Sequence, residues 1–211
     1  MIILDVPQLS DEWFAARVGI PTSSCFDQIV TTKGEPSKTR VTYMQILAGE
    51  RVTGRKSETF VSWDMKRGVE NEPIAREVYE ATKAKMGVWV DVDQVGLCYR
   101  DEEKKYSCSP DGLVGEDNNP APGGLELKDA KDSVHLKRLF EGWPKSKHFQ
   151  QIQGCMFVTG RSWWDRMSHG LGLPPLIERY YRDDKFCAAL KVALDEFCEE
   201  LDEVTEKLRR L

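Results

Sequence analysis

Two acids and one lysine stand in a pattern that suits phosphodiester chemistry. Ser109-Pro110-Asp111-Gly112 is followed, fifteen positions after Asp111, by Glu126-Leu127-Lys128. Because side chains alternate along a strand, Glu126 and Lys128 share one face while Leu127 points into the core. If a neighbouring strand ends at Asp111, two carboxylates and one ammonium meet at the edge of a sheet.

Carboxylate oxygens are hard ligands that suit Mg²⁺ or Mn²⁺ and not zinc. Such an ion polarises a phosphate and lowers the pKa of a bound water, and Lys128 is placed to orient that water or to steady transition-state charge. The tripeptide acid-x-Lys occurs six times in the chain, so it decides little alone, but only Glu126 has apolar neighbours on both sides within a strand-like stretch. A salt-bridged strand pair without catalytic function is the alternative that these residues leave open.

The elements around this pattern change type along the chain. Apolar spacing predicts a capped helix from Ser10, a short helix near 22–30, and helices near 41–52 and 61–84, with Val69, Ile74, Val78 and Tyr79 inward on the last. Short strands are expected at 88–90, 96–99, 112–114, 124–127, 161–168 and 176–181, and further helices at 132–140, 146–158 and 186–208. This order indicates one α/β layer structure with a central group of strands.

Composition sets the class of protein. The chain has 211 residues, of which 40% are hydrophobic and 31% charged, so a disordered chain is excluded and a single domain over residues 1–211 is expected. The net charge of −5 argues against a simple polybasic nucleic-acid binder. However, residues 183–211 carry nine acids and five bases, whereas residues 31–56 carry six bases and two acids. The acidic average therefore hides a basic N-terminal side that can track phosphates.

Other site classes lack their signatures. The chain starts without a basic, apolar leader and has no apolar run of the ~18–20 residues that span a bilayer, so we expect a cytoplasmic protein with no membrane partner. Six cysteines are scattered without a C-x-x-C pair, which argues for reduced thiols and against zinc or iron–sulfur sites. The three histidines are too dispersed for a metal triad and are expected at the surface or in a cleft. No G-x-S-x-G or G-x-x-x-x-G-K-[ST] motif is present.

Several ordered blocks resemble one family. Asp111 with Glu126-x-Lys128 is similar to the PD-(D/E)xK nuclease motif, and the chain resembles the lambda exonuclease and YqaJ-type viral recombinase family. The blocks that carry the resemblance are Trp13…Arg17-x-Gly19-Ile20-x-Thr22-x-Ser24, Gly68-Val69-Glu70-Asn71, Tyr99-Arg100-Asp101-Glu102, Cys108-Ser109-Pro110-Asp111-Gly112-Leu113, Gly124-Leu125-Glu126-Leu127-Lys128 and Gln151-Ile152-Gln153. Their order matches from the first helix to the glutamine-containing helix.

The resemblance implies a restriction-endonuclease-like fold, with a central mixed sheet flanked by helices. It further implies a processive exonuclease that degrades one strand of linear duplex DNA from its 5′ end and leaves a 3′ single-stranded tail for annealing recombination. Family members of this kind form a ring-shaped homotrimer and work with a phage single-strand annealing protein in the cytoplasm of a bacterial host.

The same resemblance implies roles for individual residues. Asp111, Glu126 and the main-chain carbonyl of Leu127 would hold two Mg²⁺ ions, for which Mn²⁺ could substitute. Lys128 would assist the attacking water, and Glu70 would support the metal site from the long helix. A pocket for the 5′ phosphate would be formed by four further side chains, Arg17, Ser24, Ser109 and Gln153. Guanidinium and hydroxyl donors of this kind suit a phosphate.

Alternatives stay open for several of these residues. Arg17 could pair with Asp11 or Glu12 on its own helix, and Gln153 could be exposed. The chain departs from the family at Asp129-Ala130, where Cys-Pro is expected after the lysine. A PD-(D/E)xK endonuclease of restriction or repair type is the rival enzyme, and a non-catalytic DNA-end-binding protein is the rival from another class.

Overall fold

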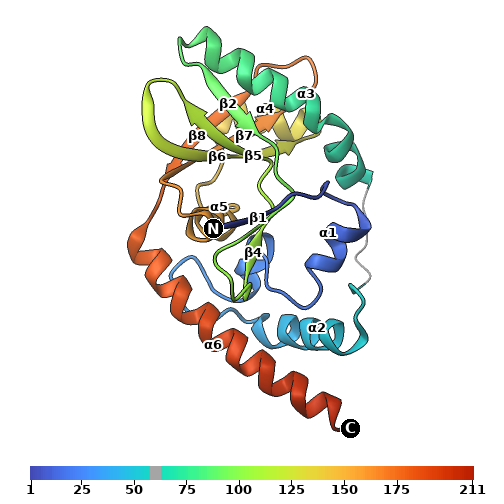
Figure 1. The fold of residues 1–211 in the computed structure, drawn as a ribbon. Helices are drawn as coiled ribbons and strands as arrows, with labels where there is room; N and C mark the ends of the chain where they lie inside the picture. The colour runs from blue at the N-terminus through green and yellow to red at the C-terminus, as the bar shows by residue number, and fades with distance from the viewer. Residues whose placement is uncertain (58–62) are drawn as a thin grey trace.

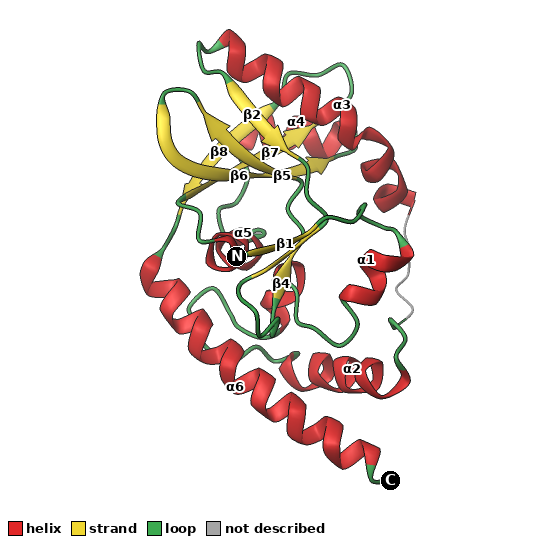
Figure 2. Ribbon diagram, in the orientation of Figure 1, coloured by secondary structure: helices red, strands yellow, loops and turns green. Residues whose placement is uncertain are grey.

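A five-stranded mixed sheet with helices on both faces forms the centre of the computed structural model, which describes residues 1–57 and 63–211 (Figures 1 and 2). The strand order is β2-β5-β6-β7-β8. Their bounds are β2 Val90–Asp93, β5 Gly112–Glu116, β6 Asn119–Asp129, β7 Trp163–His169 and β8 Leu176–Tyr181. Only the β6–β7 pair is parallel among these neighbours, because α4 and α5 connect the two strands. The predicted central mixed sheet flanked by helices is therefore confirmed.

The helices follow the predicted order closely. They are α1 Asp11–Ala16, the 3-10 helix η1 Ser23–Gln28, α2 Arg40–Thr53, α3 Trp63–Lys85, α4 Asp132–Glu141, α5 Phe149–Thr159 and α6 Asp184–Arg209. Ser10 caps α1 by accepting from the backbone N–H of Trp13, as its position predicts. Val61, where the long helix was expected to begin, lies outside the described residues, and that helix continues through Pro73. No helix in the described ranges is long and apolar enough to cross a bilayer.

The strand expected at 96–99 is present as β3 Leu97–Tyr99, but it belongs to a second, smaller sheet that was not predicted. The other strands of this sheet are β1 Ile2–Leu4 and β4 Ser107–Cys108, in the order β1-β3-β4. With two or three residues each, β1 and β4 are too short for alternation to be visible in sequence. The small sheet lies between α5 and α1 and leads directly into the segment that carries Ser109 and Asp111 (Figure 1).

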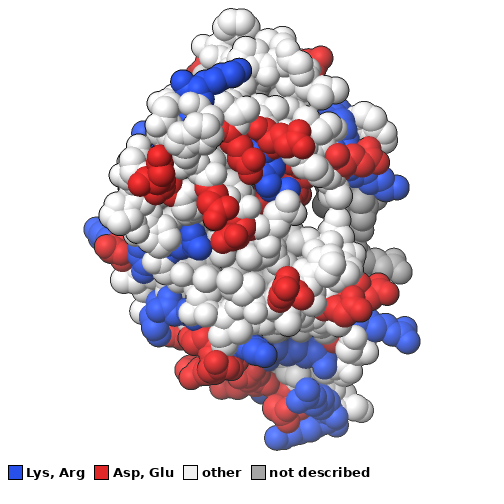
Figure 3. Space-filling model, turned by 45° about the horizontal axis from the view of Figure 1, so that its top comes forward, with Lys and Arg blue, Asp and Glu red and all other residues white. Residues whose placement is uncertain are grey.

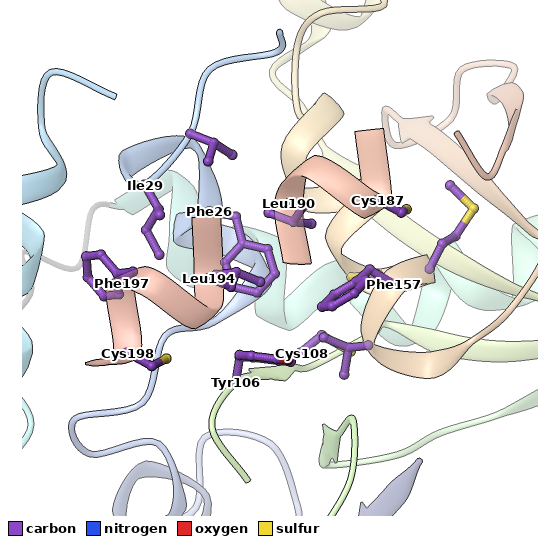
Figure 4. Close-up of a cluster of buried hydrophobic side chains, with 14 of the residues drawn as sticks. Phe26, Ile29, Tyr106, Cys108, Phe157, Cys187, Leu190, Leu194, Phe197 and Cys198 are labelled. Carbon is purple, nitrogen blue, oxygen red and sulfur yellow. The ribbon is translucent and has the colours of Figure 1, made fainter. Parts of the chain in front are cut away.

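The two faces of the large sheet bury separate hydrophobic clusters. On one face, Ala75 and Tyr79 of α3 pack against Leu125 and Leu127 of β6. On the other, α5, α6, η1 and α2 enclose a larger cluster that includes Phe26, Phe157, Leu190, Leu194 and Phe197 (Figure 4). Consecutive strand residues point to opposite faces, so the sheet divides the apolar side chains between two cores.

Strand β7 contributes a buried ring to each core: Trp163 lies in one and Trp164 in the other. His135 and His169 are also buried, so the expected surface or cleft position is wrong for these two histidines. His135 hydrogen-bonds the Ser168 hydroxyl (2.8 Å) and the Pro174 carbonyl (2.9 Å). The six cysteines are free, and all except Cys25 are buried.

Helix α3 meets the sheet with a face that its apolar pattern predicts only in part. Tyr79 is buried as expected, but Val69 and Ile74, which were also expected to face inward, are exposed, and Ala75 is buried. The inward face also contains Arg76 and Lys83, which are buried through ion pairs. Since the face mixes small, aromatic and charged residues, apolar spacing alone could not locate it.

The basic N-terminal segment meets the acidic C-terminal helix. Arg40 of α2 makes two hydrogen bonds to Glu200 of α6, at 2.5 and 2.9 Å, and Arg51 pairs with Asp202. At the lower end of Figure 3, where these helices lie, basic and acidic atoms gather side by side. Lys56 pairs with Glu50 of α2 at 3.0 Å, so three of the six bases expected to track phosphates are paired within the chain.

An ion-pair network fixes the side of the sheet formed by β5, β7 and β8. Glu116 accepts from Arg179 Nη1 (2.9 Å) and Nη2 (2.5 Å) and pairs with Lys83 Nζ at 2.7 Å. The Glu116 side chain is 3% exposed. The Arg179 hydrogen bonds, aided by Lys83, lower the pKa of Glu116 to about 2 from its usual 4.5.

This network predicts an acid-sensitive contribution to stability. A carboxyl whose pKa is lowered by folding stabilises the protein above its unfolded-state pKa, and that stabilisation is lost as the pH falls from about 4.5 toward 2. We expect Glu116→Gln to lower the free energy of unfolding at pH 7 and to flatten its fall across that pH window. Urea unfolding at several pH values measures this, and an unchanged pH slope in the variant would contradict it.

Candidate active site

A cavity of about 760 Å³ opens between α1, α3, α5 and the segment joining β4 to β5. Acidic side chains and a lysine line one part, and hydroxyls with an arginine line another. The lining residues used below are Trp13, Arg17, Ser24, Glu72, Arg76, Ser109, Asp111, Glu126, Lys128 and Gln151.

The acidic part is built by β6 and the residue before β5. Gly112 pairs with Leu125 across antiparallel strands, so Asp111 lies beside the middle of β6. Its Oδ2 accepts from the Leu127 backbone N–H at 2.6 Å. Glu126 and Lys128 lie two residues apart on β6 and form an ion pair. The structure thus brings Asp111, Glu126 and Lys128 together, with Leu127 buried between them.

Glu126 has an incomplete set of partners. It is 2% exposed, and its Oε1 accepts from Lys128 and from Gln151 Nε2 at 2.7 Å. Its Oε2 is buried and has no hydrogen-bond partner in residues 1–57 and 63–211. Burying a carboxylate oxygen without a hydrogen-bond donor costs free energy unless the oxygen coordinates a cation. Glu126 is therefore suited to bind a hard divalent ion.

Electrostatics in the cleft follow from burial and like charge. Burial raises the pKa of the Asp111 carboxyl, and the Glu126 carboxylate raises it further. For Lys128, burial acts to lower the pKa, but the charges of Glu126 and Asp111 more than offset this, so the pKa lies above its usual value. Lys128 is therefore an ammonium that donates hydrogen bonds. Two carboxylates lie close together beside it, and a bound cation would reduce their mutual repulsion.

The helix acid that faces these residues is Glu72 and not Glu70. Glu70 is exposed and lines a neighbouring, more apolar pocket with Lys66. Glu72 lines the cleft with Asp111, Glu126 and Lys128, and burial raises its pKa. Residues 70 and 72 point about 200° apart around a helix, so a two-residue difference in register decides which acid enters the site.

Arg76, four residues after Glu72, connects this helix to the acidic part of the cleft. Its Nη2 donates to Glu72 Oε1 at 2.7 Å and to the Asp111 carbonyl at 3.1 Å. Arg76 is 8% exposed, which places a buried cation behind the carboxylates. The four-residue spacing of Glu72 and Arg76 was visible in the sequence, but which helix face meets the sheet was not.

A second group of donors gathers at the other part of the cavity. Arg17 follows α1, and its Nη1 and Nη2 lie 3.2 Å from Ser109 Oγ and from Thr22 Oγ1. Thr22 in turn hydrogen-bonds Ser24 Oγ at 3.0 Å. Trp13 fixes the group, because its Nε1 donates to Ser109 Oγ at 3.0 Å and its ring lies 3.9 Å below the Arg17 guanidinium.

Arg17 keeps donor capacity for a ligand. Within the described ranges, no carboxylate forms an ion pair with it, and its buried Nε has no hydrogen-bond partner. The expected alternative, pairing with Asp11 or Glu12, is therefore not seen. Burial lowers the pKa of the guanidinium, yet its usual value is so high that it stays charged. A half-buried guanidinium that lies among hydroxyls and has no ion pair with a carboxylate of the described residues suits a phosphate.

Gln153 does not join this group. It is 2% exposed, its Nε2 donates to the Tyr181 carbonyl at 3.0 Å, and its Oε1 accepts from the Asp183 N–H at 2.9 Å. It therefore ties α5 to the start of α6. The glutamine that reaches the cleft is Gln151, two residues earlier. The resemblance contained both residues, but nearly all of α5 is buried, so the pattern did not tell the two faces apart.

Within the described part of the chain, no three His, Cys, Asp or Glu side chains are already gathered to hold a metal ion. Magnesium usually binds through one or two carboxylates together with waters and substrate phosphates. Asp111, Glu126 and the Leu127 carbonyl match that smaller ligand set.

Known proteins that resemble this chain are nucleases or belong to a viral recombinase family. Residues 12–162 match the model of the YqaJ-like viral recombinase domain. The chain is similar to the alkaline exonuclease LHK-Exo from Laribacter hongkongensis, with 33% identity over 95% of this chain and 97% of that chain and a TM-score of 0.79. LHK-Exo in complex with dAMP gives the same identity and coverage and a TM-score of 0.80. A phage-related exonuclease from Haemophilus somnus 129PT shares the fold, at 12% identity over 90% and 96% of the two chains and a TM-score of 0.66. No curated protein gives a significant match.

Proposed function

The chain belongs to the YqaJ-like viral recombinase family, and from this premise we propose that it is a Mg²⁺-dependent exonuclease. It degrades one strand of linear duplex DNA from a 5′-phosphorylated end and leaves a 3′ single-stranded tail for annealing recombination. Its similarity to the alkaline exonuclease LHK-Exo over nearly the full length of both chains supports nuclease chemistry.

One observation carries the proposal: a single cavity joins a phosphate-type donor group to a carboxylate–lysine group. Arg17, Ser24 and Ser109 lie in one part of it, and Asp111, Glu126 and Lys128 in the other. A terminal phosphate held by the first group would place the next phosphodiester near the second. An enzyme with this arrangement removes one nucleotide at each cut. It does not cleave a strand that has no free end.

Each residue of the acidic part has a task that its contacts support. Asp111, Glu126 and the Leu127 carbonyl would hold two Mg²⁺ ions, which polarise the scissile phosphate and lower the pKa of water when bound. Mn²⁺, which takes the same oxygen ligands, could substitute. Glu72 supports this site from across the cleft. Lys128, as an ammonium, orients the attacking water and stabilises charge on the phosphate oxygens.

The donor part binds and orients the DNA end. Arg17 offers its guanidinium to the 5′ phosphate, while the Ser24 and Ser109 hydroxyls donate further hydrogen bonds. LHK-Exo has been crystallised with dAMP, a nucleoside monophosphate, which is the class of product that we propose here. We further propose a ring-shaped homotrimer and a single-strand annealing partner, acting in the cytoplasm of a bacterial host.

The test compares DNA topologies. With Mg²⁺, the purified protein is expected to degrade linear 5′-phosphorylated duplex and to leave covalently closed circles intact. Cleavage of closed circles would instead support the PD-(D/E)xK endonuclease. Binding to linear ends without any cleavage, in Mg²⁺ or Mn²⁺, would support a non-catalytic DNA-end-binding protein.

The donor group predicts a preference for phosphorylated ends. Hydrogen bonds between charged groups contribute about 1.5–3 kcal/mol each, so we expect Arg17→Ala to slow digestion of 5′-phosphorylated duplex by about 10–100-fold. Digestion of 5′-hydroxyl duplex, which offers Arg17 no terminal phosphate, is expected to be slow in the wild type and to change little in the variant. Initial rates on the two substrates measure the effect. Arg209→Ala, at the far end of α6, is the matched control, and equal slowing of both substrates by Arg17→Ala would contradict the assignment.

A further inference from the structure

Asp129, the last residue of β6, directly follows Lys128 and belongs to neither group of the cleft. Its side chain is 4% exposed. Three donors surround its two oxygens: Arg67 Nε lies 2.6 Å from Oδ2, while Asn71 Nδ2 and His169 Nδ1 lie 3.2 and 3.4 Å from Oδ1. One buried carboxylate thus connects α3, β6 and β7.

Two of these donors belong to one helix face. Arg67 and Asn71 are four residues apart on α3, so both point toward the end of β6. Among the described side chains in this part of the helix, the large apolar ones, Trp63 and Val69, are 70% and 47% exposed. The described apolar contacts of α3 with β6 are made further along, by Ala75 and Tyr79. The hydrogen bonds to Asp129 therefore attach the first half of α3 to the end of β6.

Glu72 lies between two such attachments. Asn71, the preceding residue, is bound to Asp129, and Arg76, four residues later, is bound to the Asp111 carbonyl at 3.1 Å. Both attachments end on the segments that carry the cleft carboxylates. The rotation of α3 about its axis, and with it the direction of Glu72, is thereby fixed relative to Asp111 and Glu126.

From these contacts we infer that Asp129 is a positioning residue, which sets the orientation of α3 so that Glu72 faces the metal site. This inference rests on the proposed metal-dependent nuclease. In this role Asp129 acts through its contacts with Asn71 and Arg67 and not as a ligand of metal or DNA. Residues that orient metal ligands in this way typically contribute 10–100-fold to metal affinity.

The test measures metal binding without DNA. MnCl₂ is titrated calorimetrically into the metal-free wild-type protein and into Asp129→Asn. An amide has one acceptor oxygen where the carboxylate has two, so it cannot satisfy both Arg67 and Asn71. We expect the dissociation constant for Mn²⁺ to rise about 10-fold in the variant. Asn71→Ala, which removes one neutral donor, should shift it in the same direction by less.

Glu116→Gln is the matched control, since Glu116 is also a buried carboxylate with cationic partners but is attached to β8 and the C-terminal part of α3. It should lower the unfolding temperature and leave Mn²⁺ affinity within about twofold. An Mn²⁺ affinity of Asp129→Asn equal to that of wild type would overturn the inference and leave the proposed function intact. A wild-type protein that binds no Mn²⁺ would overturn both.

Discussion

Lys128→Ala is expected to lower the rate of DNA digestion by about 10³-fold, because a positioned donor to the attacking water and the phosphate is lost. Binding to 5′-phosphorylated ends should stay within a few-fold of wild type, since the donors for that phosphate, Arg17, Ser24 and Ser109, are untouched. Single-turnover rates with excess enzyme, together with end binding measured in Ca²⁺, separate the two effects.

The Lys128 variant needs a control for folding. Removing the ammonium leaves Glu126 buried without its ion-pair partner, which destabilises the fold. Lys128→Gln keeps a hydrogen-bond donor of similar length and is expected to fold, yet to lose nearly as much rate. Lys137→Ala removes an exposed lysine paired with Glu141 and should digest DNA like wild type. A Lys128→Gln protein with near-normal turnover would remove Lys128 from the mechanism.

Asp111→Asn separates function from stability. We expect digestion to fall by at least about 10³-fold, because a ligand of the ions that activate water is lost. Without metal, however, the variant should be as stable as wild type or more stable. Burial and the neighbouring Glu126 carboxylate raise the pKa of Asp111, so the folded protein disfavours its ionised form, and this cost grows as the pH rises through that pKa.

An amide removes that cost while its oxygen can still accept from the Leu127 N–H. Thermal unfolding at pH 7 with and without Mg²⁺ measures both parts of the prediction. The rise in melting temperature caused by Mg²⁺ in wild type should disappear in Asp111→Asn. Asp101→Asn, an exposed carboxyl from another block of the family pattern, should keep that rise. A full Mg²⁺-induced rise in Asp111→Asn would contradict the assignment of this carboxylate.

Strand periodicity was a better guide to the site than helix periodicity. On a strand, alternation leaves two faces, and the apolar Leu127 settles that Glu126 and Lys128 share the other one. On α3 the residues in contact with the sheet include Arg76 and Lys83, while Val69 and Ile74 are exposed. The apolar pattern therefore predicted the burial of Tyr79 correctly but misplaced Val69 and Ile74, and Glu70 was expected at the site that Glu72 lines.

Local sequence patterns could not predict the contacts between segments that are distant in the chain. The Arg40–Glu200 pair joins residues 160 positions apart, and the contacts of Asp129 with Arg67 and Asn71 span 62 and 58 positions. In sequence, each of these residues is one charged or polar side chain among many. The α5 glutamines show the same limit, since only the packed helix reveals that Gln151 reaches Glu126 and Gln153 reaches the β8–α6 connection.

The polarity of digestion tests the central claim most directly, because a terminal-phosphate site and a cleavage site in one cavity impose a direction on the strand. One strand of a 5′-phosphorylated linear duplex carries a radioactive 5′ phosphate, and a second preparation carries the label at its 3′ end. With Mg²⁺, the account predicts early release of the 5′ label as a mononucleotide, while the 3′ label stays in long fragments. Early release of the 3′ label, or of the 5′ label in oligonucleotides, would contradict it.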